Sequence, residues 1–183
     1  MSQPFEAALR RLIAMEGEYS DDPADSGGKT RFGITEAQAR AYGYTGEMRN
    51  LPPDVARRIY RAQYWDLLHL DEIAAFAPGI AVEMFDTAVN QGQATAARYL
   101  QRALNLFNRN QTNYVDMRVD GLVGLVTLAA LRAYMASRGR EAEVVMLRAL
   151  NAQQGAAYID LAERREKDER FVYGWFVNRV EIP

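Results

Sequence analysis

The chain has 183 residues, 49% of them hydrophobic and 25% charged, with a formal net charge of -2, which is typical of a globular protein able to bury a core. The even mixture of charges provides no basic patch for nucleic acid, and no apolar run approaches the roughly 20 residues that span a bilayer. The absence of cysteine excludes disulfides and thiol nucleophiles, and the single histidine, His69, argues against a Ser-His-Asp triad.

The pattern of apolar residues predicts a mainly α fold with one short β-element after the first helix. Thr35 opens "TEAQ", a capping box with Gln38, and "RFGIT" (residues 31–35) is the best candidate for a short strand. A polar connection over 108–124 turns at Asp120-Gly121. In chain order, the helices are predicted over residues 5–16, 35–42, 52–70, 80–91, 94–107, 125–137 and 140–165.

The stretch "MEGEYSDDPADSGGKTRFGIT" (residues 15–35) concentrates carboxylates at the end of the first predicted helix. Leu12 and Ile13 project along the apolar stripe to Glu16, which therefore stands where the next core residue is expected. Burial and the negative end of the helix dipole would both raise the pKa of Glu16, as a general acid requires. The alternative is a frayed helix end with Glu16 in water.

Two further residues of this stretch could join Glu16. Asp25 precedes the turn at Gly27-Gly28, and Thr30 begins the next extended segment, so a turn folding back would bring both near the helix end. One protonated acid and one ionised carboxylate are the pair that glycoside hydrolysis uses. The alternative for Asp25 is a solvated turn. A calcium loop is disfavoured because the spacing does not match the EF-hand pattern, and we expect no metal and no other cofactor.

Side chains elsewhere suit a saccharide. Glu83, Asp86 and Asn90 share one face of a predicted helix, either as a solvated face or as a cleft wall that binds sugar hydroxyls and N-acetyl groups. Three aromatic side chains could stack on sugar rings, although rings at helical spacing more often belong to a core. These aromatic residues are Tyr19, Tyr64 and Trp65.

"EGEYSDDPADSGGKTRFGIT" resembles the signature of glycoside hydrolase family 108, the phage-type N-acetylmuramidases. The resemblance continues in "IYRAQYWD" and "FDTAVNQG". In the second half, "LQRALN", "VDGLVGLVTLAAL" and "FVYGWFVNR" resemble the peptidoglycan-binding region that follows the catalytic part in this family. The resemblance implies a lysozyme-like fold with a catalytic lobe over 1–92 and a binding lobe over 93–183, together one compact structural unit.

The resemblance also implies roles for individual residues. Glu16 corresponds to the first glutamate of the family's signature. The wider lysozyme superfamily has a glutamate at a helix end followed by an acid and a threonine on an adjoining hairpin, and Asp25 and Thr30 match these two by order and approximate spacing. The implied reaction is hydrolysis of the β-1,4 bond between N-acetylmuramic acid and N-acetylglucosamine in peptidoglycan glycan strands, by a monomer that does not insert into membranes. Asp86 and Asn90 would belong to the cleft wall.

Two other activities stay open. Lytic transglycosylation would leave an anhydro-sugar end. The second alternative is a protein that binds peptidoglycan but has lost catalysis, because Glu18 stands where the family usually has glycine. The N-terminal residues lack an ordinary secretory signal, although the substrate lies outside the membrane. The resemblance therefore suggests a phage or prophage endolysin released through a holin pore, or a dedicated secretion route.

Overall fold

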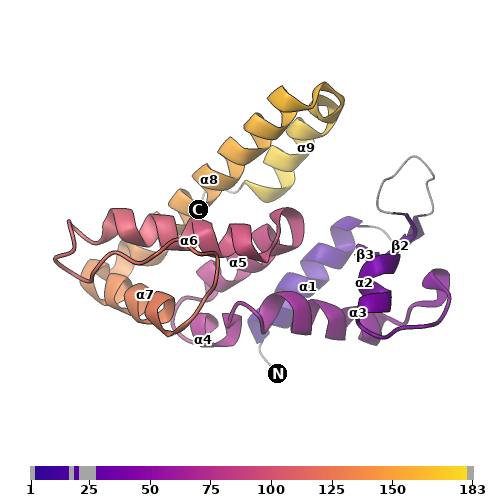
Figure 1. Ribbon diagram of the computed structural model, residues 1–183, viewed down its shortest axis with the longest axis horizontal. Helices are drawn as coiled ribbons and strands as arrows, with labels where there is room; N and C mark the ends of the chain where they lie inside the picture. Colours follow the sequence, from indigo (N-terminus) through magenta and orange to yellow (C-terminus); the bar gives the residue numbers. More distant parts are fainter. Residues whose placement is uncertain (1–2, 17–18, 21–27, 181–183) are drawn as a thin grey trace. The chain divides into compact units, whose positions relative to one another are not determined.

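The structure, a computed structural model, describes residues 3–16, 19–20 and 28–180. The chain divides into two compact units, Met1–Leu67 and Leu68–Pro183. Helices dominate both units, and the strands of the described residues all lie in one small antiparallel sheet that follows the first helix (Figure 1). The predicted fold class, mainly α and lysozyme-like with a small β-element after the first helix, is confirmed.

The first unit begins with helix α1 (Gln3–Glu16), followed by strands β1 (Tyr19–Ser20), β2 (Thr30–Arg31) and β3 (Ile34–Thr35). The apolar stripe predicted for α1 is buried at Phe5, Ala8, Leu9 and Leu12. The sheet order is β1-β2-β3, and Ser20 lies opposite Thr30. The stripe therefore packs α1 against the core, and the sheet begins at Tyr19, soon after α1 ends at Glu16.

The single strand predicted over 31–35 is wrong, because this segment is a hairpin. β2 and β3 pair around a two-residue turn at Phe32 and Gly33, with φ of 52° and 74°. Two positive φ values in a two-residue loop are the requirement of a type I′ turn, whose twist suits a hairpin. Phe32 is only 8% exposed, and its carbonyl accepts a hydrogen bond from the Tyr60 hydroxyl at 2.9 Å. Burial and this hydrogen bond offset the cost of a positive φ at a bulky residue.

Helix α2 (Glu36–Ala41) begins at the predicted capping box. The Gln38 amide nitrogen of the main chain donates to the Thr35 hydroxyl, and the Gln38 side-chain oxygen accepts from the Thr35 amide at 3.0 Å. A 3-10 turn, η1 (Met48–Asn50), then leads to α3 (Pro53–Tyr60), which starts at its prolines as predicted. Both helix starts therefore follow from capping and proline signals in the sequence.

A π-helix, η2 (Arg61–Trp65), continues α3 and changes the face that the chain buries. A wider turn shifts the following residues around the helix axis. Ala62 is exposed, whereas Tyr64 and Trp65 are buried. The π-helix therefore brings two aromatic rings into the core.

The second unit contains the remaining helices (Figure 1). Its central helix, α5, contacts α4, α6 and α8, and buries Ile80, Met84 and Phe85. The predicted helices over 80–91, 94–107, 125–137 and 140–165 are confirmed, while the helix formed by the aromatic C-terminal segment was not predicted. The bounds are α4 (Leu70–Ala74), α5 (Pro78–Gln91), α6 (Gln93–Phe107), α7 (Leu125–Arg138), η3 (Gly139–Glu141), α8 (Ala142–Arg164), η4 (Glu166–Asp168) and α9 (Glu169–Arg179).

A side chain from α8 caps the start of α5. The Glu143 carboxylate accepts hydrogen bonds from the main-chain amides of Gly79, at 2.6 Å, and Ile80, at 3.3 Å. These amides have no partner inside the helix, and a carboxylate at this end also meets the positive end of the helix dipole. Over the described ranges, no helix combines the length and apolarity that crossing a bilayer needs.

Candidate functional site

The first unit holds the catalytic residues that the sequence predicts. Glu16 is the last residue of α1, as the apolar stripe indicated. Thr30 begins β2, lies opposite Ser20 in the sheet and is partly buried. Ser20 is four residues beyond Glu16, so the two Cα atoms are separated by at most about 14 Å. The backbone therefore returns Thr30 to the vicinity of the end of α1.

Two residues of the acidic stretch, Asp25 and Glu18, lie outside the described residues. Tyr19 lies in β1, opposite Arg31. The roles of Asp25 in catalysis and of Tyr19 in sugar binding stay predictions.

Tyr64 and Trp65 belong to the core of the first unit. Trp65 has no exposed surface, and its ring meets Phe5 edge-on with 5.2 Å between centroids. Tyr64 is 6% exposed, and its hydroxyl accepts a hydrogen bond from the Gln38 side chain at 2.5 Å. Burial raises the pKa of Tyr64, so this hydroxyl stays protonated at neutral pH. A ring that stacks on a sugar needs an open face. Tyr64 and Trp65 have none, so both are core residues and are no longer proposed to bind sugar.

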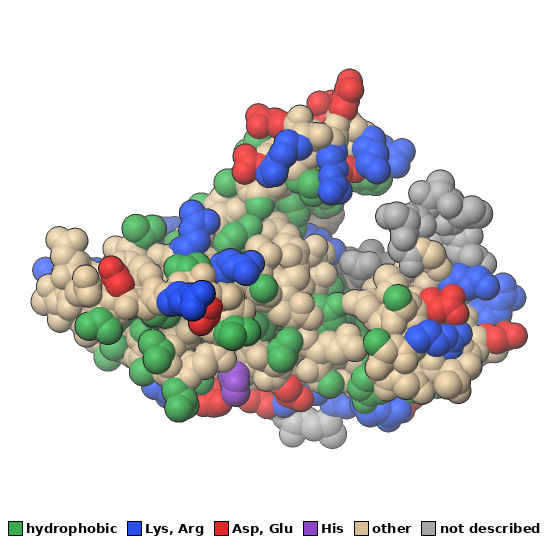
Figure 2. Space-filling view, in the orientation of Figure 1, with side chains coloured by type: hydrophobic (Ala, Val, Ile, Leu, Met, Phe, Trp, Pro, Cys, Tyr) green, Lys and Arg blue, Asp and Glu red, His purple; other side chains and the backbone are tan. Residues whose placement is uncertain are grey.

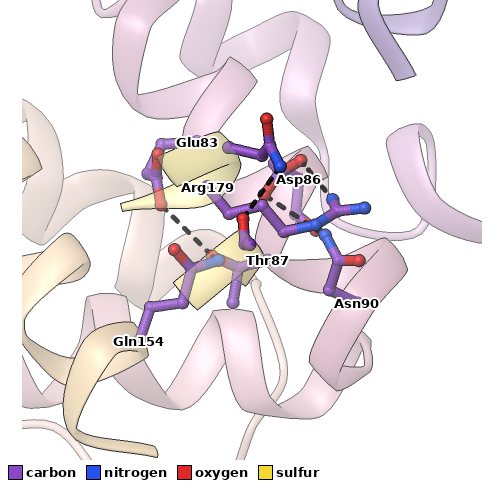
Figure 3. A network of polar contacts seen from close by, with 8 residues as sticks. Glu83, Asp86, Thr87, Asn90, Gln154 and Arg179 are labelled. Carbon is purple, nitrogen blue, oxygen red and sulfur yellow. Dashed lines mark hydrogen bonds and ion pairs between the residues drawn. The ribbon is translucent and has the colours of Figure 1, made fainter. Parts of the chain in front are cut away.

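Asp86 and Asn90, the other predicted sugar-binding residues, lie on α5 in the second unit. Figure 3 shows Arg179 of α9 reaching Asp86, with 3.0 Å between Nη1 and Oδ1. The side chains are 12% exposed for Arg179 and 23% for Asp86. The Asn90 amide donates to the Asp86 carbonyl at 2.8 Å and to its carboxylate at 3.2 Å. Asp86 therefore joins α9 to α5 and is not part of a fully solvated face.

A second chain of polar contacts joins α5 to α8 (Figure 3). The Gln154 amide donates to the Thr87 hydroxyl at 3.2 Å, and this hydroxyl lies 3.4 Å from Glu83 Oε1. Arg179 and Gln154 are 93 and 67 residues away from their partners on α5, so local spacing gave no signal for either. The sequence pattern predicted the polar face of α5, but it did not predict that Arg179 of α9 and Gln154 of α8 bind to that face.

Side chains that could bind a metal ion do not cluster in the part of the chain that the structure describes. Within residues 3–16, 19–20 and 28–180, no group of three or more His, Cys, Asp or Glu side chains is placed to hold an ion. The single histidine, His69, instead lies 3.0 Å from the Glu72 carboxylate and is exposed.

Two protein family models match consecutive segments of the chain. Residues 9–92 match Glycosyl hydrolase 108. Residues 95–180 match Predicted Peptidoglycan domain. The family resemblance is thereby confirmed in both halves, and the two matches support a lysozyme-like glycoside hydrolase that acts on peptidoglycan.

One solved structure is similar to this chain over both halves. The structure titled "Structure of Brucella abortus SagA" shares 26% identity with this chain, at a TM-score of 0.68. The match covers 93% of this chain and 86% of that one. Comparison with curated proteins gave no match.

The family boundary and the division into compact units fall at different places. The glycosyl hydrolase 108 match ends at residue 92, whereas the second compact unit begins at Leu68. Helices α4 and α5 are thus glycosyl hydrolase 108 sequence that packs in the second unit. The predicted lobes, 1–92 and 93–183, meet at the end of the family match. That these two segments form separate lobes stays a prediction.

Proposed function

We propose that this protein is an N-acetylmuramidase that hydrolyses the β-1,4 bond between N-acetylmuramic acid and N-acetylglucosamine in peptidoglycan. The observation that carries the proposal is Glu16 at the C-terminal end of α1, in a segment that matches glycosyl hydrolase 108 and is followed at once by a small antiparallel sheet. This position supplies an acid at a helix end and a hairpin that can present partner groups beside it.

Glu16 acts as the general acid in this proposal. The unpaired carbonyl groups at the C-terminal end of α1 carry partial negative charge. This negative end of the helix dipole favours the protonated form of a nearby carboxyl group. The protonated acid donates its proton to the glycosidic oxygen as the bond to the sugar breaks. Asp25 positions water or stabilises the oxocarbenium-like transition state, and Thr30 supports it from β2.

The decisive test replaces Glu16 by glutamine, which keeps the shape of the side chain but delivers no proton. We expect Glu16→Gln to lower the rate of lysis of purified cell wall by about 10²-fold or more, with unchanged circular dichroism. Glu36→Gln is the matched control, because Glu36 makes an exposed ion pair with Arg40 at 2.7 Å, and such pairs contribute little. Retention of lysis within about threefold of the parent would overturn the role of Glu16.

Mass spectrometry of the released fragments identifies the reaction. Reducing N-acetylmuramic acid ends are expected for hydrolysis, whereas anhydro ends would replace the proposal with lytic transglycosylation. Wall binding without any product from the parent protein would replace it with a binding protein that has lost catalysis.

Asp25→Asn separates catalysis from loop shape. If Asp25 acts on charge that develops in the transition state, turnover should fall much more than retention on insoluble peptidoglycan. Asparagine is a good turn residue, so a role in shaping the turn alone predicts near-normal turnover. Unchanged turnover would remove Asp25 from the proposed mechanism.

A further inference from the structure

The hairpin that contains Thr30 turns at a residue with an unfavourable backbone conformation. Phe32 has a φ of 52°, in the left-handed region that bulky side chains rarely occupy. Residues in such conformations persist only where the surrounding structure holds them, and they concentrate at functional sites. The contacts that hold Phe32 therefore bear on the function of this hairpin.

Tyr60 of α3 holds the turn of the hairpin. Its hydroxyl donates to the Phe32 carbonyl at 2.9 Å, and both residues are buried, with 1% of Tyr60 and 8% of Phe32 exposed. The Arg31 guanidinium also lies over the Phe32 ring, 5.0 Å from its centroid. A buried carbonyl that loses its donor is left unsatisfied, so the Tyr60 hydroxyl stabilises the turn in this conformation.

A second tyrosine holds the other end of the hairpin. Tyr64 lies within η2, one turn after Tyr60, and the two ring centroids are 5.7 Å apart. The Tyr64 hydroxyl accepts from the Gln38 side chain at 2.5 Å, and the side-chain oxygen of Gln38 accepts from the main-chain amide of Thr35 at 3.0 Å. Thr35 is the residue of β3 that lies opposite Thr30. The helix formed by α3 and η2 thus contacts the turn of the hairpin directly and its open end through Gln38.

The buried contacts restrain the hairpin more than the surface charges do. Figure 2 shows charged side chains of both signs on the surface around α2, and the ion pair of Glu36 with Arg40 on this helix is exposed. Exposed ion pairs contribute little to stability. The buried tyrosines come from a segment with a π-helix, an irregularity that is frequent at functional sites.

We propose that Tyr60 and Tyr64 are positioning residues for hydrolysis, because they fix the hairpin that presents Thr30 near the end of α1. This role rests on the proposed function, in which Thr30 takes part in catalysis. Both rings are buried, so their hydroxyls act through Phe32 and Gln38 and not on the substrate. A small displacement of a group that acts in the transition state lowers the rate much more than it weakens substrate binding.

The test removes one hydroxyl at a time and keeps the ring. Tyr60→Phe and Tyr64→Phe are compared with Tyr134→Phe, a matched control in the second unit. Tyr134 is also 1% exposed, and its hydroxyl donates to the Ala142 carbonyl at 2.9 Å, the same length as the bond of Tyr60. Tyr60→Phe and Tyr134→Phe therefore each remove one buried hydrogen bond, and only the first of these bonds ends on the hairpin.

Turnover of soluble peptidoglycan glycan strands measures the positioning role. We expect Tyr60→Phe to lower kcat about tenfold with KM within about twofold of the parent. Tyr64→Phe should lower kcat less, about threefold, because Gln38 keeps its bonds to Thr35. Tyr134→Phe should keep the parental kcat. A parental kcat in Tyr60→Phe or in Tyr64→Phe would overturn the role of that tyrosine, and an equal loss in Tyr134→Phe would reduce the effect to lost stability.

A double variant shows whether Tyr60 acts through Thr30. In the Thr30→Ala background, Tyr60→Phe should change kcat by less than about twofold, because the side chain that it positions is already removed. A loss of stability alone would instead lower kcat by the same factor in both backgrounds. Equal factors would therefore overturn the proposal.

Amide hydrogen exchange tests the same contact without any substrate. The amides of the β2–β3 hairpin should exchange about tenfold faster in Tyr60→Phe than in the parent, and at the parental rate in Tyr134→Phe. Parental exchange in Tyr60→Phe would overturn the positioning role whatever the activity. A parent that hydrolyses no glycan would overturn the proposed function, whereas an active parent with an unchanged kcat in Tyr60→Phe would overturn the positioning role alone.

Discussion

At the scale of single residues, Glu143 shows how one side chain can define the start of a distant helix. α5 begins at Pro78 without a capping side chain of its own, and Glu143 on α8 accepts from two of its first amides. A hydrogen bond to a charged group is stronger than a neutral one, and its loss leaves partly buried donors unsatisfied. The start of α5 therefore depends on tertiary packing.

We predict that Glu143→Ala lowers the free energy of unfolding by about 1–2 kcal/mol. Glu143→Gln should lose less, because the amide oxygen still accepts while the charge at the helix dipole is removed. Urea denaturation followed by circular dichroism measures both, with the exposed Glu141→Ala as control. Equal stability of Glu143→Ala and the control would contradict the capping role.

At the scale of elements, an ion pair joins α1 to α3 in the first unit. Arg57 donates from Nε to Glu6 Oε1 at 2.9 Å and also contacts the same oxygen through Nη2. Both side chains are about one-third exposed. The hydrogen bond from Arg57, assisted by the nearby Arg10 and Arg61, lowers the pKa of Glu6 below its usual 4.5.

This pair gives the first unit a defined pH dependence. Because the folded pKa of Glu6 is lowered, its stabilisation is present above pH 4.5 and is lost as the pH falls through the lowered value. We predict that Glu6→Gln lowers the melting temperature near pH 6 and that the difference from the parent becomes smaller as the pH falls below 4.5. Thermal melts across this range test it, and a difference that is constant with pH would contradict the electrostatic origin.

Elements also show where sequence reasoning succeeds and where it stops. The stripe from Phe5 to Leu12 predicted α1 and the position of Glu16, because a helix that buries one face must repeat apolar residues at that spacing. The turn at Phe32 was missed, because a bulky residue with positive φ is stabilised by Tyr60, far away in the sequence. Local patterns therefore predict helices better than turns held by tertiary contacts.

The same distinction applies to the candidate site. Glu16 and Thr30 could be proposed from one continuous stretch of sequence, since the helix and the following strands lie close along the chain. Arg179 could not be found in this way, because its contact with Asp86 depends on how α9 and α5 both pack on α8. Trp65 was included among sugar contacts because periodicity alone does not reveal the face change at the π-helix.

At the scale of the whole molecule, α5 links the family boundary to the folding of the second unit. It is matched as glycosyl hydrolase 108 sequence, yet it packs on α6 and α8 and buries Ile80, Met84 and Phe85 there. Removing α5 would remove these side chains and expose the faces of α6 and α8 that pack against it, at a cost of roughly 25 cal/mol for each Å² of apolar surface.

We predict that a fragment of residues 68–183 unfolds cooperatively on heating, whereas a fragment of residues 93–183 does not. The longer fragment keeps α5 in its packing, and the shorter one lacks it. Calorimetry and the dispersion of amide resonances distinguish the two. Cooperative unfolding of 93–183 with dispersed resonances would contradict the dependence on α5 and would support the lobes predicted from the sequence.

The position of α5 also bears on how such enzymes could exchange parts during evolution. A recombination event at residue 92 would join a foreign α6 and α8 to a native α5, so every apolar contact between them would have to suit a new partner. A crossover near residues 66–69, before α4 begins at Leu70, would transfer α5 together with the helices that it contacts. Hybrid enzymes are therefore better assembled at this earlier junction, within the sequence that matches glycosyl hydrolase 108.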